Sequence, residues 1–320
     1  MSTDQQIHLY DVAIVGAGPA GLTAAVYTAR KQLNVIMVTM DIGGQTNLTA
    51  GIANYMGFEY ISGAELARKF QEQVQHFPIT TRLGALVTRL TPESDHFHVV
   101  TTDGEEFNCR TVIISTGKHS RKLGVPGETE LVGRGVSYCA TCDGPFFRGV
   151  PVLVVGGGNS GIEAAISLSK VASQVTVVEV LDRWRGDQVL MEQAERAPNL
   201  SWLVQHRVTA IRGQNQVESV LVESGATGEK QELAVQGVFI EIGLIPNTEW
   251  LGDLVELNEW KEIVVDCRAA TSVTGIFAAG DVANTPHKQI IIAAGDGAKA
   301  ALSAYDYLLR QGAVQPQREW

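Results

Sequence analysis

The sequence is poor in cysteine, in basic residues and in long apolar runs. Its 320 residues include only four cysteines, too few for a small secreted domain held together by disulfides. No stretch comes near the ~18 apolar residues of a membrane span, and the polar residues 1–10 do not resemble a signal peptide. The formal net charge of −10 argues against nucleic acid or an anionic membrane as the main partner. We therefore expect a cytoplasmic protein with no membrane partner and no nucleic-acid partner.

Two of the cysteines lie close together, and their spacing leaves several explanations open. Cys139 and Cys142 belong to YCATCDGPFF at 138–147, where a structural disulfide, half of a zinc site, a redox-active dithiol or chance would each place two thiols. A zinc site needs a second close pair of ligands, but Cys109 and Cys267 are isolated and the histidines are scattered, so we expect no metal. We expect the two isolated cysteines to be small, buried or half-buried hydrophobic residues. In a reducing compartment, a Cys-x-x-Cys pair is more often catalytic or metal-binding than structural.

The sequence is rich in glycine, and part of that glycine belongs to a repeated pattern. It contains 33 glycines, about a tenth of the chain against a usual ~7%. Residues 11–30 (DVAIVGAGPAGLTAAVYTAR) and 151–170 (PVLVVGGGNSGIEAAISLSK) each predict an apolar strand, a Gly-x-Gly-x-x-Gly turn and an alanine-rich helix, and a second strand follows at 34–40 and at 174–180. Each pattern is therefore a β-α-β unit, which requires a parallel sheet.

This context is the one that a dinucleotide-binding turn requires. The first glycine makes the turn, the second lets the backbone approach a pyrophosphate, and the third lets the helix pack on the strand, while the helix N-terminus offers N–H groups to the phosphates. The candidate binding residues are Gly16, Gly18, Pro19, Ala20 and Gly21 in the first turn, and Gly156, Gly158, Asn159, Ser160 and Gly161 in the second.

Two such units predict an α/β protein with two Rossmann-like, three-layer β/β/α nucleotide-binding domains, the second inserted in the first. The turn-rich stretches at 117–127 and 243–248 mark the joints. A hairpin is expected within 208–224, and a final helix from about 290 to 311. The expected domains are 1–118 with 247–320 for the first, and 119–246 for the inserted one.

The end of each second strand indicates which nucleotide binds where. In dinucleotide folds an acidic residue ~20 residues beyond the turn accepts from the ribose hydroxyls. Glu179 lies 23 residues after Gly156, whereas the same offset from the first turn gives Thr39. The inserted domain therefore predicts NAD, and the charge of Glu179 would repel the 2′-phosphate of NADPH, which favours NADH. Two alternatives stay open: Glu179 is a solvated strand-end acid, or Arg183 and Arg185 fold back toward a 2′-phosphate.

A flavin site is indicated near the end of the chain. Asp281, in FAAGDVA at 277–283, follows a strand and would accept hydrogen bonds from a polyol such as the ribityl chain of FAD. Lys288, Gln289 and Ile290 open the last helix, where backbone N–H groups would face the pyrimidine end of a flavin.

Six motifs occur in the order found in low-molecular-weight thioredoxin reductases, which the sequence resembles from residue 11 to about 310. They are GAGPAGL at 16–22, GGQ at 43–45, STG at 115–117, CATCDG at 139–144, GGGNSGIEAA at 156–165 and FAAGD at 277–281. The resemblance implies FAD in the first domain, a pyridine nucleotide in the inserted domain, a homodimer, and reduction of a protein disulfide. The residues implied to bind FAD are Gly16, Gly18, Pro19, Ala20, Gly21, Gly44, Gln45, Asn54, Thr116, Gly117, Gly280, Asp281, Lys288, Gln289 and Ile290.

The resemblance also implies roles for the cysteine pair. Cys139 and Cys142 become a redox-active disulfide, in which Cys142 faces the flavin and Cys139 attacks the disulfide of the partner. Asp143 becomes the general acid beside them. The alternative for Asp143 is a cap of the turn that follows.

The sequence departs from thioredoxin reductases that use NADPH. Those carry a His-Arg-Arg run where this sequence has Glu179-Val180-Leu181. The stretches VTVVEV, GVFIEIGLIPNTEWL and KQIIIAAGDGAKAALSAYDYL look closer to the flavoprotein component of alkyl hydroperoxide reductase, which is NADH-linked. That component has an additional N-terminal thioredoxin-like domain, whereas this sequence starts at the FAD fold. We therefore expect the partner to be a separate thioredoxin-like or peroxiredoxin-linked protein.

The final stretch, GAVQPQREW, raises a further alternative. Trp320 is either an incidental aromatic residue of a disordered tail or a ring that stacks on an isoalloxazine where nicotinamide would otherwise bind. In the second case the disulfide chemistry is the same, but the donor is ferredoxin or an unknown reductant. A small-molecule dithiol oxidase and a nucleotide-sensing flavoprotein without turnover are the remaining alternatives, and a sensor has no need of the Cys139–Cys142 pair.

Overall fold

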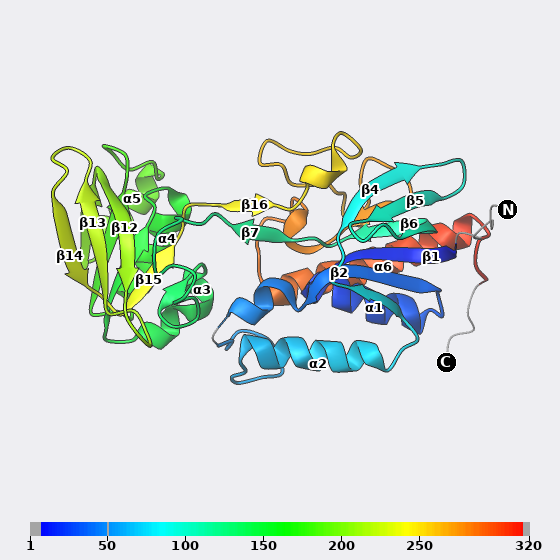
Figure 1. Cartoon of the computed structure of the whole chain (residues 1–320), viewed down its shortest axis with the longest axis horizontal. Coiled ribbons are helices and arrows are strands. Elements are labelled where there is room, and N and C mark those ends of the chain that lie inside the picture. Colours follow the sequence, from blue (N-terminus) through cyan, green and yellow to red (C-terminus); the bar gives the residue numbers. More distant parts are fainter. Residues whose placement is uncertain (1–7, 50, 316–320) are drawn as a thin grey trace. The chain divides into compact units, whose positions relative to one another are not determined.

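The structure, a computed structural model, describes residues 8–49 and 51–315 and divides into two compact units (Figure 1). Unit 1 comprises the described residues up to Asn47, then Ala64–His119, and those from Ile245 onward, whereas unit 2 comprises Leu48–Gly63 and Ser120–Leu244. The chain passes between the units within β7 (Lys118–Ser120) and β16 (Leu244–Pro246), which pair with each other.

The segment 48–63 differs from the sequence-based division, which placed it in the first domain. Its residues Ile52 and Ile61 form a β-bridge, and the Tyr60 ring packs edge-on against Phe146 with ring centroids 5.8 Å apart. A Cβ added at Gly51 would lie 2.4 Å from the Phe146 ring. These close apolar contacts associate the segment with unit 2, and no local sequence pattern reports such contacts.

Unit 1 is built on a seven-stranded sheet with a parallel centre. The strand order is β3-β2-β1-β6-β5-β4, and β17 pairs with β6; only the β4–β5 and β5–β6 pairs of this sheet are antiparallel. The strands are β1 (Leu9–Ala17), β2 (Val35–Ile42), β3 (Thr80–Leu83), β4 (Val87–Pro92), β5 (Phe97–Thr101), β6 (Glu106–Ile114) and β17 (Ile276–Ala278). The helices are α1 (Pro19–Arg30), α2 (Gly63–Gln75) and α6 (Ile290–Arg310), with short 3-10 turns η1 (Gly44–Leu48), η3 (Glu249–Leu251) and η4 (Gly280–Val282).

Residues of β1 alternate between two apolar cores, one on each face of the sheet. Val12 and Ile14 pack in a core with the alanines of α1 and α6, and these two helices lie along the same sheet in Figure 1. Ala13 and Val15 point to the other face, into a core that they share with β4 and β5. Because side chains on a strand alternate in direction, a strand buried on both faces reads as one continuous apolar run, and β1 is such a strand.

Unit 2 repeats the arrangement with a smaller parallel sheet and an antiparallel layer. Its five-stranded sheet has the order β11-β10-β9-β15-β8, and a three-stranded sheet has the order β12-β13-β14. The strands are β8 (Val136–Ser137), β9 (Pro151–Val155), β10 (Gln174–Glu179), β11 (Leu200–Val204), β12 (His206–Arg212), β13 (Ser219–Ser224), β14 (Lys230–Ala234) and β15 (Gly237–Ile240). The helices are α3 (Ala140–Asp143), α4 (Asn159–Ser169) and α5 (Gln188–Glu195), and η2 (Gly144–Phe147) follows α3 directly.

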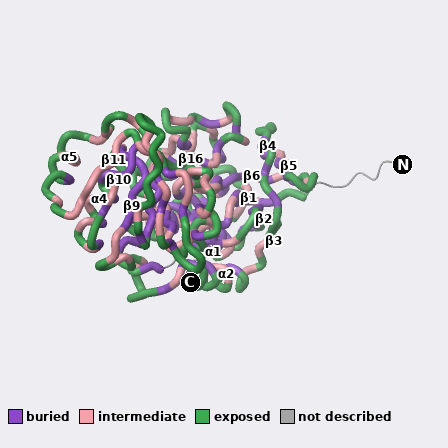
Figure 2. The backbone as a smooth tube through the Cα atoms, turned by 60° about the vertical axis from the view of Figure 1, so that its left-hand side comes forward, coloured by how far each residue is buried: buried purple, intermediate pink, exposed green. Residues whose placement is uncertain are grey.

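The parallel strands of unit 2 are covered on both faces. In β9, Val152 and Val154 pack in a core with the apolar face of α4, whereas Leu153 and Val155 pack with β12 and β13. In Figure 2 the tube along β9 and β10 is mostly coloured as buried. The three layers are therefore helix, parallel sheet and antiparallel sheet.

The main secondary-structure predictions are confirmed. Both β-α-β units are present, as β1-α1-β2 and β9-α4-β10 with parallel pairing of their strands. The hairpin within 208–224 is the antiparallel pair β12–β13, and the last helix is α6. Among the residues that the structure describes, no helix is both long and apolar enough to cross a membrane.

Candidate redox and nucleotide sites

The first glycine-rich turn, in unit 1, admits no larger residue at its first and third glycines. Gly16 has a φ of +103°, and a Cβ there would lie 2.5 Å from the backbone oxygen of Ser115. A Cβ at Gly21 would lie 1.9 Å from the backbone oxygen of Gly16. The turn, the strand and the helix are therefore in direct backbone contact, as a dinucleotide-binding turn requires.

The second glycine of this turn leaves open space. A Cβ at Gly18 would meet no atom within 4 Å. Gly18 precedes α1, and among the described residues no side chain caps the N–H groups at this helix end. Across from it lies Gly44, whose added Cβ would come within 3.5 Å of the Gly18 Cα. An uncapped helix N-terminus beside two glycine backbones fits the pyrophosphate of FAD, because the helix end offers N–H groups and the glycines leave space for the phosphates. The Gly44 N–H itself donates to the Asp41 carboxylate at 3.1 Å.

The GGQ and FAAGD motifs border the same turn. Gly280 has a φ of +76°, and a Cβ there would lie 2.9 Å from the Ala20 Cβ at the start of α1. Asp281 follows within η4 and is partly buried. Burial raises the pKa of Asp281, and the positive charges of Lys288 and Lys118 partly offset this effect. At the start of α6, Gln289 occupies the N-cap position without a side-chain bond to the helix end, and Ile290 is the first helical residue.

The remaining FAD candidates lie partly in unit 1 and partly outside it. Thr116 donates through its hydroxyl to the backbone oxygen of Asn247 at 2.9 Å, and Gly117 follows with a φ of +66°. The Gln45 side-chain amide donates to the backbone oxygen of Lys118. Asn54 is exposed and belongs to unit 2, so the structure does not bring it together with the others within unit 1.

A buried cluster of charged groups lies beside Asp281, and the motifs of the sequence did not indicate it. Lys118 and Lys288 both form ion pairs with Glu262, and the amide of Asn258 donates to the second carboxylate oxygen at 2.7 Å. Burial alone would raise the pKa of Glu262, but the hydrogen bonds from Lys118, Asn258 and Lys288 together hold this pKa below its ordinary value. Two ammonium groups and two carboxylates are thus concentrated at one edge of the flavin candidate.

Replacing Lys118 with methionine is expected to destabilise the protein by roughly 3 kcal/mol, the low end of the cost of breaking a buried ion pair, because Lys288 and Asn258 still contact Glu262. The Lys118–Glu262 pair contributes fully to the free energy of unfolding at pH values above the unfolded-state pKa of a glutamate. This contribution is lost as the pH falls through the folded-state pKa of Glu262, which is lowered. Urea unfolding of the FAD-loaded protein at pH 7 and at pH 3.5 measures both effects.

A matched control for this variant is the exposed pair of Arg68 and Glu72 on α2. Replacing Arg68 with methionine is expected to cost less than about 0.5 kcal/mol at either pH. Equal losses of unfolding free energy for the Lys118 and Arg68 variants at pH 7 would show that the buried cluster contributes no more to stability than an exposed ion pair.

The second glycine-rich turn, in unit 2, has the same local geometry as the first. Gly156 has a φ of +116°, and a Cβ at Gly161 would lie 1.9 Å from the backbone oxygen of Gly156. Gly158 occupies the N-cap position of α4 without a side-chain cap among the described residues, and a Cβ there would meet no atom within 4 Å. Asn159 and Ser160 are the first two residues of the helix and are exposed.

Glu179 is buried at the end of β10 and is bonded to the backbone. Its carboxylate accepts from the Gly157 N–H at 2.7 Å and from the Leu181 N–H at 2.9 Å. In unit 1 the Thr39 hydroxyl takes the equivalent place and accepts from the Ala17 N–H at 3.2 Å. The alternative of a solvated strand-end acid is therefore wrong for Glu179, because the side chain is buried and one oxygen accepts from Gly157 of the turn while the other accepts from Leu181 just after β10.

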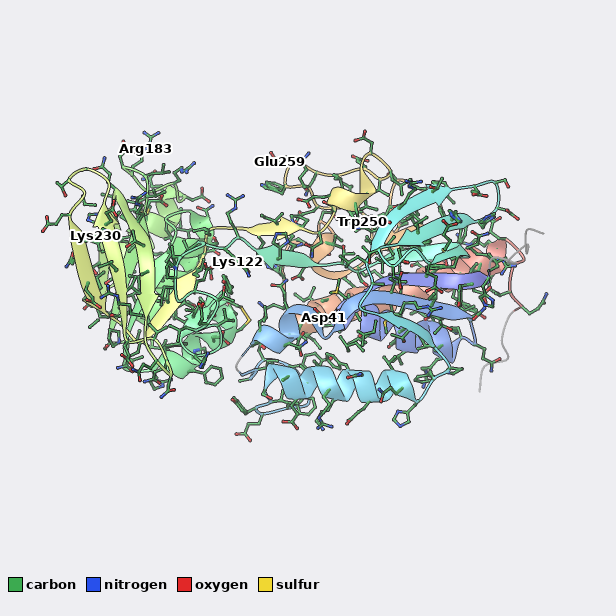
Figure 3. The ribbon with its side chains drawn as sticks, in the orientation of Figure 1. Asp41, Lys122, Arg183, Lys230, Trp250 and Glu259 are labelled. Carbon is green, nitrogen blue, oxygen red and sulfur yellow. A yellow bond between two sulfur atoms is a disulfide. The ribbon has the colours of Figure 1, made fainter. Side chains whose placement is uncertain are left out.

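The segment after β10 folds back against this turn, and it does so through the Trp184 ring and the backbone of Arg185, contacts that the sequence did not predict. The Arg185 N–H donates to the Gly157 oxygen at 2.9 Å, and a Cβ at Gly157 would lie 2.6 Å from the Trp184 ring. The Asp187 N–H donates to the Asn159 side chain at 2.8 Å. Arg183 is exposed and is drawn at the edge of its unit, directed into solvent (Figure 3).

The cysteine pair forms a disulfide in unit 2, drawn as the yellow bond in Figure 3. Cys139 is the N-cap residue of α3, and Cys142 lies within this one-turn helix. The Cα atoms are 5.3 Å apart, and the Cys142 N–H donates to the Cys139 sulfur at 3.2 Å. Both cysteines are partly exposed. The short helix therefore fixes the spacing of the two sulfur atoms and leaves them accessible.

Asp143 is buried directly after the pair. Its carboxylate accepts from the Ser137 hydroxyl at 2.7 Å, and the same hydroxyl accepts from the Cys139 N–H at 3.0 Å. Asp143 is also the N-cap residue of η2, but its side chain makes no capping hydrogen bond there. The capping alternative is therefore wrong, and the carboxylate is linked through Ser137 to the backbone of the cysteine motif.

The other two cysteines behave differently from each other. Cys109 is fully buried in β6, and burial raises the pKa of its thiol. Cys267 is exposed, which corrects the expectation of a buried or half-buried residue: it lies in a turn that the Asp266 carboxylate organises by accepting from the N–H groups of Arg268 and Ala270. Trp320 lies outside the described residues.

Some site residues were missed although the sequence carried a signal for them. Lys118 directly follows the STG motif, and Glu241 ends the apolar run GVFI of β15. A charged residue at the end of a buried strand is a candidate for a site. Trp184 and Glu262 carry no comparable local signal, because only the folded chain brings them to their partners.

Comparison with known proteins gives consistent results. The profile of the family described as pyridine nucleotide-disulphide oxidoreductase matches residues 10–298. The F subunit of alkyl hydroperoxide reductase from Staphylococcus aureus is 43% identical over 301 residues, which make up 94% of this chain and 59% of that protein. The chain thus spans less than two thirds of the length of the curated relatives it matches.

Two solved structures extend the comparison. The thioredoxin reductase from Streptococcus pyogenes is 41% identical, with a TM-score of 0.90 over 95% of this chain and 100% of that chain. A thioredoxin reductase from Gloeobacter violaceus is 35% identical, with a TM-score of 0.55 over 100% of both chains.

Proposed function

Because the chain belongs to the pyridine nucleotide-disulphide oxidoreductase family, we propose that it is an FAD-dependent disulfide reductase of the thioredoxin reductase kind. In this proposal, electrons pass from NADH by way of FAD to Cys139 and Cys142, and from these to the disulfide of a thioredoxin-like or peroxiredoxin-linked protein. The observation that carries the proposal is the Cys139–Cys142 disulfide, partly exposed on a one-turn helix in a chain with two glycine-rich dinucleotide turns.

The residues of unit 1 support binding of FAD. The uncapped start of α1 and the glycines 18 and 44 accommodate a pyrophosphate, and Asp281 would accept from the ribityl hydroxyls. The ammonium groups of the buried Lys118 and the partly buried Lys288 place positive charge beside Asp281. When bound, FAD supplies the two-electron redox chemistry that connects a nicotinamide to a disulfide.

The cysteine motif supports exchange with a protein disulfide. Reduction would release the two sulfur atoms as thiols, and a thiolate at Cys139 would attack one sulfur of the partner disulfide to give a mixed disulfide. Cys142 would then attack the Cys139 sulfur, which restores the intramolecular disulfide and releases the partner as a dithiol. Asp143 would hold or return a proton near Cys142, since its carboxylate is buried and connected to the motif through Ser137.

Glu179 supports NADH over NADPH. Its buried carboxylate lies at the end of β10, the position from which an acidic residue accepts from the ribose hydroxyls in dinucleotide folds. Replacing Glu179 with alanine is expected to lower the ratio of kcat/KM for NADH to that for NADPH about tenfold, equivalent to about 1.4 kcal/mol of discrimination. Steady-state reduction of the disulfide reagent DTNB with each nucleotide measures this ratio. An unchanged ratio would assign the preference to other residues.

A second candidate keeps the disulfide chemistry but uses a donor other than NAD(P)H. The observation that favours it is the segment 184–187, which is bonded to Gly157 and Asn159 of the second glycine-rich turn. In this candidate the segment, with its Trp184 ring, occupies the space where the dinucleotide would bind at the turn. NAD(P)H would then have to displace the segment, and the reductant would instead be ferredoxin or another electron carrier.

Anaerobic titration of the FAD-loaded protein with NADH and, separately, with NADPH tests the proposal. Stoichiometric bleaching of the flavin absorbance by NADH supports the first candidate. Bleaching by neither nucleotide, with full bleaching by dithionite, supports the second. Replacing Asp187 with alanine removes the hydrogen bond that its carboxylate accepts from the Asn159 amide at 3.0 Å and is expected to speed reduction by NADH only if the segment covers the turn.

A further inference from the structure

Glu241 is the residue after β15 (Gly237–Ile240), and it has no part in the electron transfer proposed for this protein. Its Oε1 accepts from the Ala140 N–H at 3.4 Å. Ala140 lies between Cys139 and Cys142 in sequence and is the first residue of α3. The Glu241 carboxyl therefore lies against the short helix of the cysteine motif, within unit 2, and it reaches this helix from the end of β15, whereas Ser137 belongs to β8.

The backbone of Glu241 contacts the second glycine-rich turn. A Cβ at Gly156 would lie 2.4 Å from the Glu241 backbone oxygen, and the Ser160 hydroxyl donates to that oxygen at 3.5 Å. One residue thus touches the cysteine motif through its side chain and the nucleotide turn through its main chain.

The surroundings of Glu241 favour its protonated form. Burial raises the pKa of Glu241 to about 7; the Ala140 N–H opposes this effect, and the charge of Glu163 on α4 adds to it. The titratable groups of the adjoining cysteine motif are Cys142 and Asp143 on α3 and Cys139 at its N-cap position. Among the described residues Glu241 forms no ion pair with a lysine or arginine, so no positive charge holds it ionised.

We propose that Glu241 is a second proton-exchanging group of the cysteine pair, serving Cys139 as Asp143 serves Cys142. This inference rests on the proposed function. In the dithiol state the Glu241 carboxylate takes the proton of the Cys139 thiol, and the resulting thiolate attacks one sulfur of the partner disulfide. That disulfide bond breaks as the Cys139–partner bond forms. Attack by the Cys142 thiolate then breaks the mixed disulfide, and Glu241 returns its proton to a departing partner thiolate.

The sulfur atoms balance in this sequence without another oxidant or reductant. One dithiol and one disulfide are consumed, and one disulfide and one dithiol are formed. Two protons move with the two electrons, one by way of each carboxyl group. The titrations of Glu241 and of the Cys139 thiol are linked, because a negative charge on Glu241 disfavours a thiolate nearby. The carboxyl and the thiol therefore titrate as a coupled pair.

The test uses the FAD-loaded protein with Cys142→Ser and Cys267→Ser, which leaves Cys139 and the buried Cys109. The rate of alkylation of Cys139 by iodoacetamide is followed by mass spectrometry from pH 5.5 to 10. We expect two inflections, the lower one near pH 7. Glu241→Gln should remove the lower inflection and raise the rate at pH 8 about threefold, since a one-unit fall in thiol pKa gives tenfold more thiolate and a several-fold loss of nucleophilicity.

The same substitution in the protein with all its cysteines should have the opposite effect on exchange. After chemical reduction, single-turnover reduction of a thioredoxin disulfide should slow about tenfold in Glu241→Gln and recover partly in Glu241→Asp. A residue with a purely structural role would not raise alkylation and lower exchange together. Glu163→Gln is the matched control: the lower inflection should move to lower pH, and the exchange rate should stay within about twofold.

The outcomes separate this inference from the proposed function. A single inflection, identical with and without Glu241, overturns the inference even if the protein reduces disulfides. Two inflections that depend on Glu241, in a protein that reduces no protein disulfide, sustain the proton exchange with Cys139 and overturn the proposed function. Flavin absorbance and circular dichroism confirm that each variant is folded.

Discussion

Replacing Cys142 with serine is expected to reduce turnover on a protein disulfide by at least about a thousandfold, because the remaining thiol can form a mixed disulfide but nothing resolves it. The variant should instead accumulate a covalent complex through Cys139. Non-reducing electrophoresis of the reduced variant after mixing with a thioredoxin disulfide detects this complex, and a coupled assay measures the turnover.

Two further substitutions make this prediction specific. Cys139→Ser is expected to lose turnover to the same extent without trapping the partner, since the attacking sulfur is absent. Cys267→Ser removes an exposed thiol that is far from the motif in sequence and should leave turnover unchanged. Trapping by Cys139→Ser and not by Cys142→Ser would reverse the roles of the two sulfur atoms.

Alanine at the third glycine of each turn is expected to disable one nucleotide site and spare the other. A Cβ at Gly21 or at Gly161 would lie 1.9 Å from a backbone oxygen of the same turn. The helix must then move away from its strand, which costs about 1–3 kcal/mol. Gly21→Ala should weaken FAD binding by at least about tenfold. Gly161→Ala should retain FAD and lose reduction by NADH, as measured by flavin content and anaerobic titration.

Alanine at the second glycine of the first turn, Gly18, is expected to weaken FAD binding without affecting folding. A Cβ at Gly18 meets no atom within 4 Å, so Gly18→Ala should fold normally and lose FAD affinity because its methyl group occupies the space of the pyrophosphate. Gly295→Ala on α6 adds a methyl group to equally open space away from the turn and should leave both properties unchanged. Normal FAD affinity in Gly18→Ala would show that the pyrophosphate does not approach this turn.

The parts of the fold that were predictable are those specified by short stretches of sequence. Gly16 and Gly156 adopt positive φ angles that other residues rarely adopt, and the apolar runs before them are strands buried on both faces. A β-α-β unit is therefore encoded within about thirty residues. The final helix was predictable for the same reason, since its alanine-rich face is a local pattern.

The parts that were not predictable depend on pairs of residues far apart in the chain. Lys118 and Glu262 meet across 144 positions, and Glu241 reaches Ala140 across 101. Neither partner identifies the other in a single sequence. Trp184 is closer to Gly157 in sequence, but the loop that carries it has no periodicity from which its direction could be inferred.

The two carboxyl groups at the cysteine motif show the same contrast. Asp143 is adjacent to Cys142 in sequence, and its role was implied by the resemblance of CATCDG to the motif of thioredoxin reductases. Glu241 directly follows β15 and comes to the motif through the order β9-β15-β8 of the parallel sheet, so topology places it there rather than a motif. A buried strand that ends in an acidic residue is nevertheless a signal that can be read before the structure is known.

The central claim is that the flavin site and the Cys139–Cys142 pair form one redox system, and electron counting tests it most directly. The FAD-loaded protein is titrated anaerobically with dithionite, and new thiols are alkylated and located by mass spectrometry. The account predicts uptake of four electrons per chain, two for FAD and two for the disulfide, with label at Cys139 and Cys142 and uptake of only two in the Cys139→Ser/Cys142→Ser variant. Uptake of two electrons by both proteins, with no label at the pair, would contradict it.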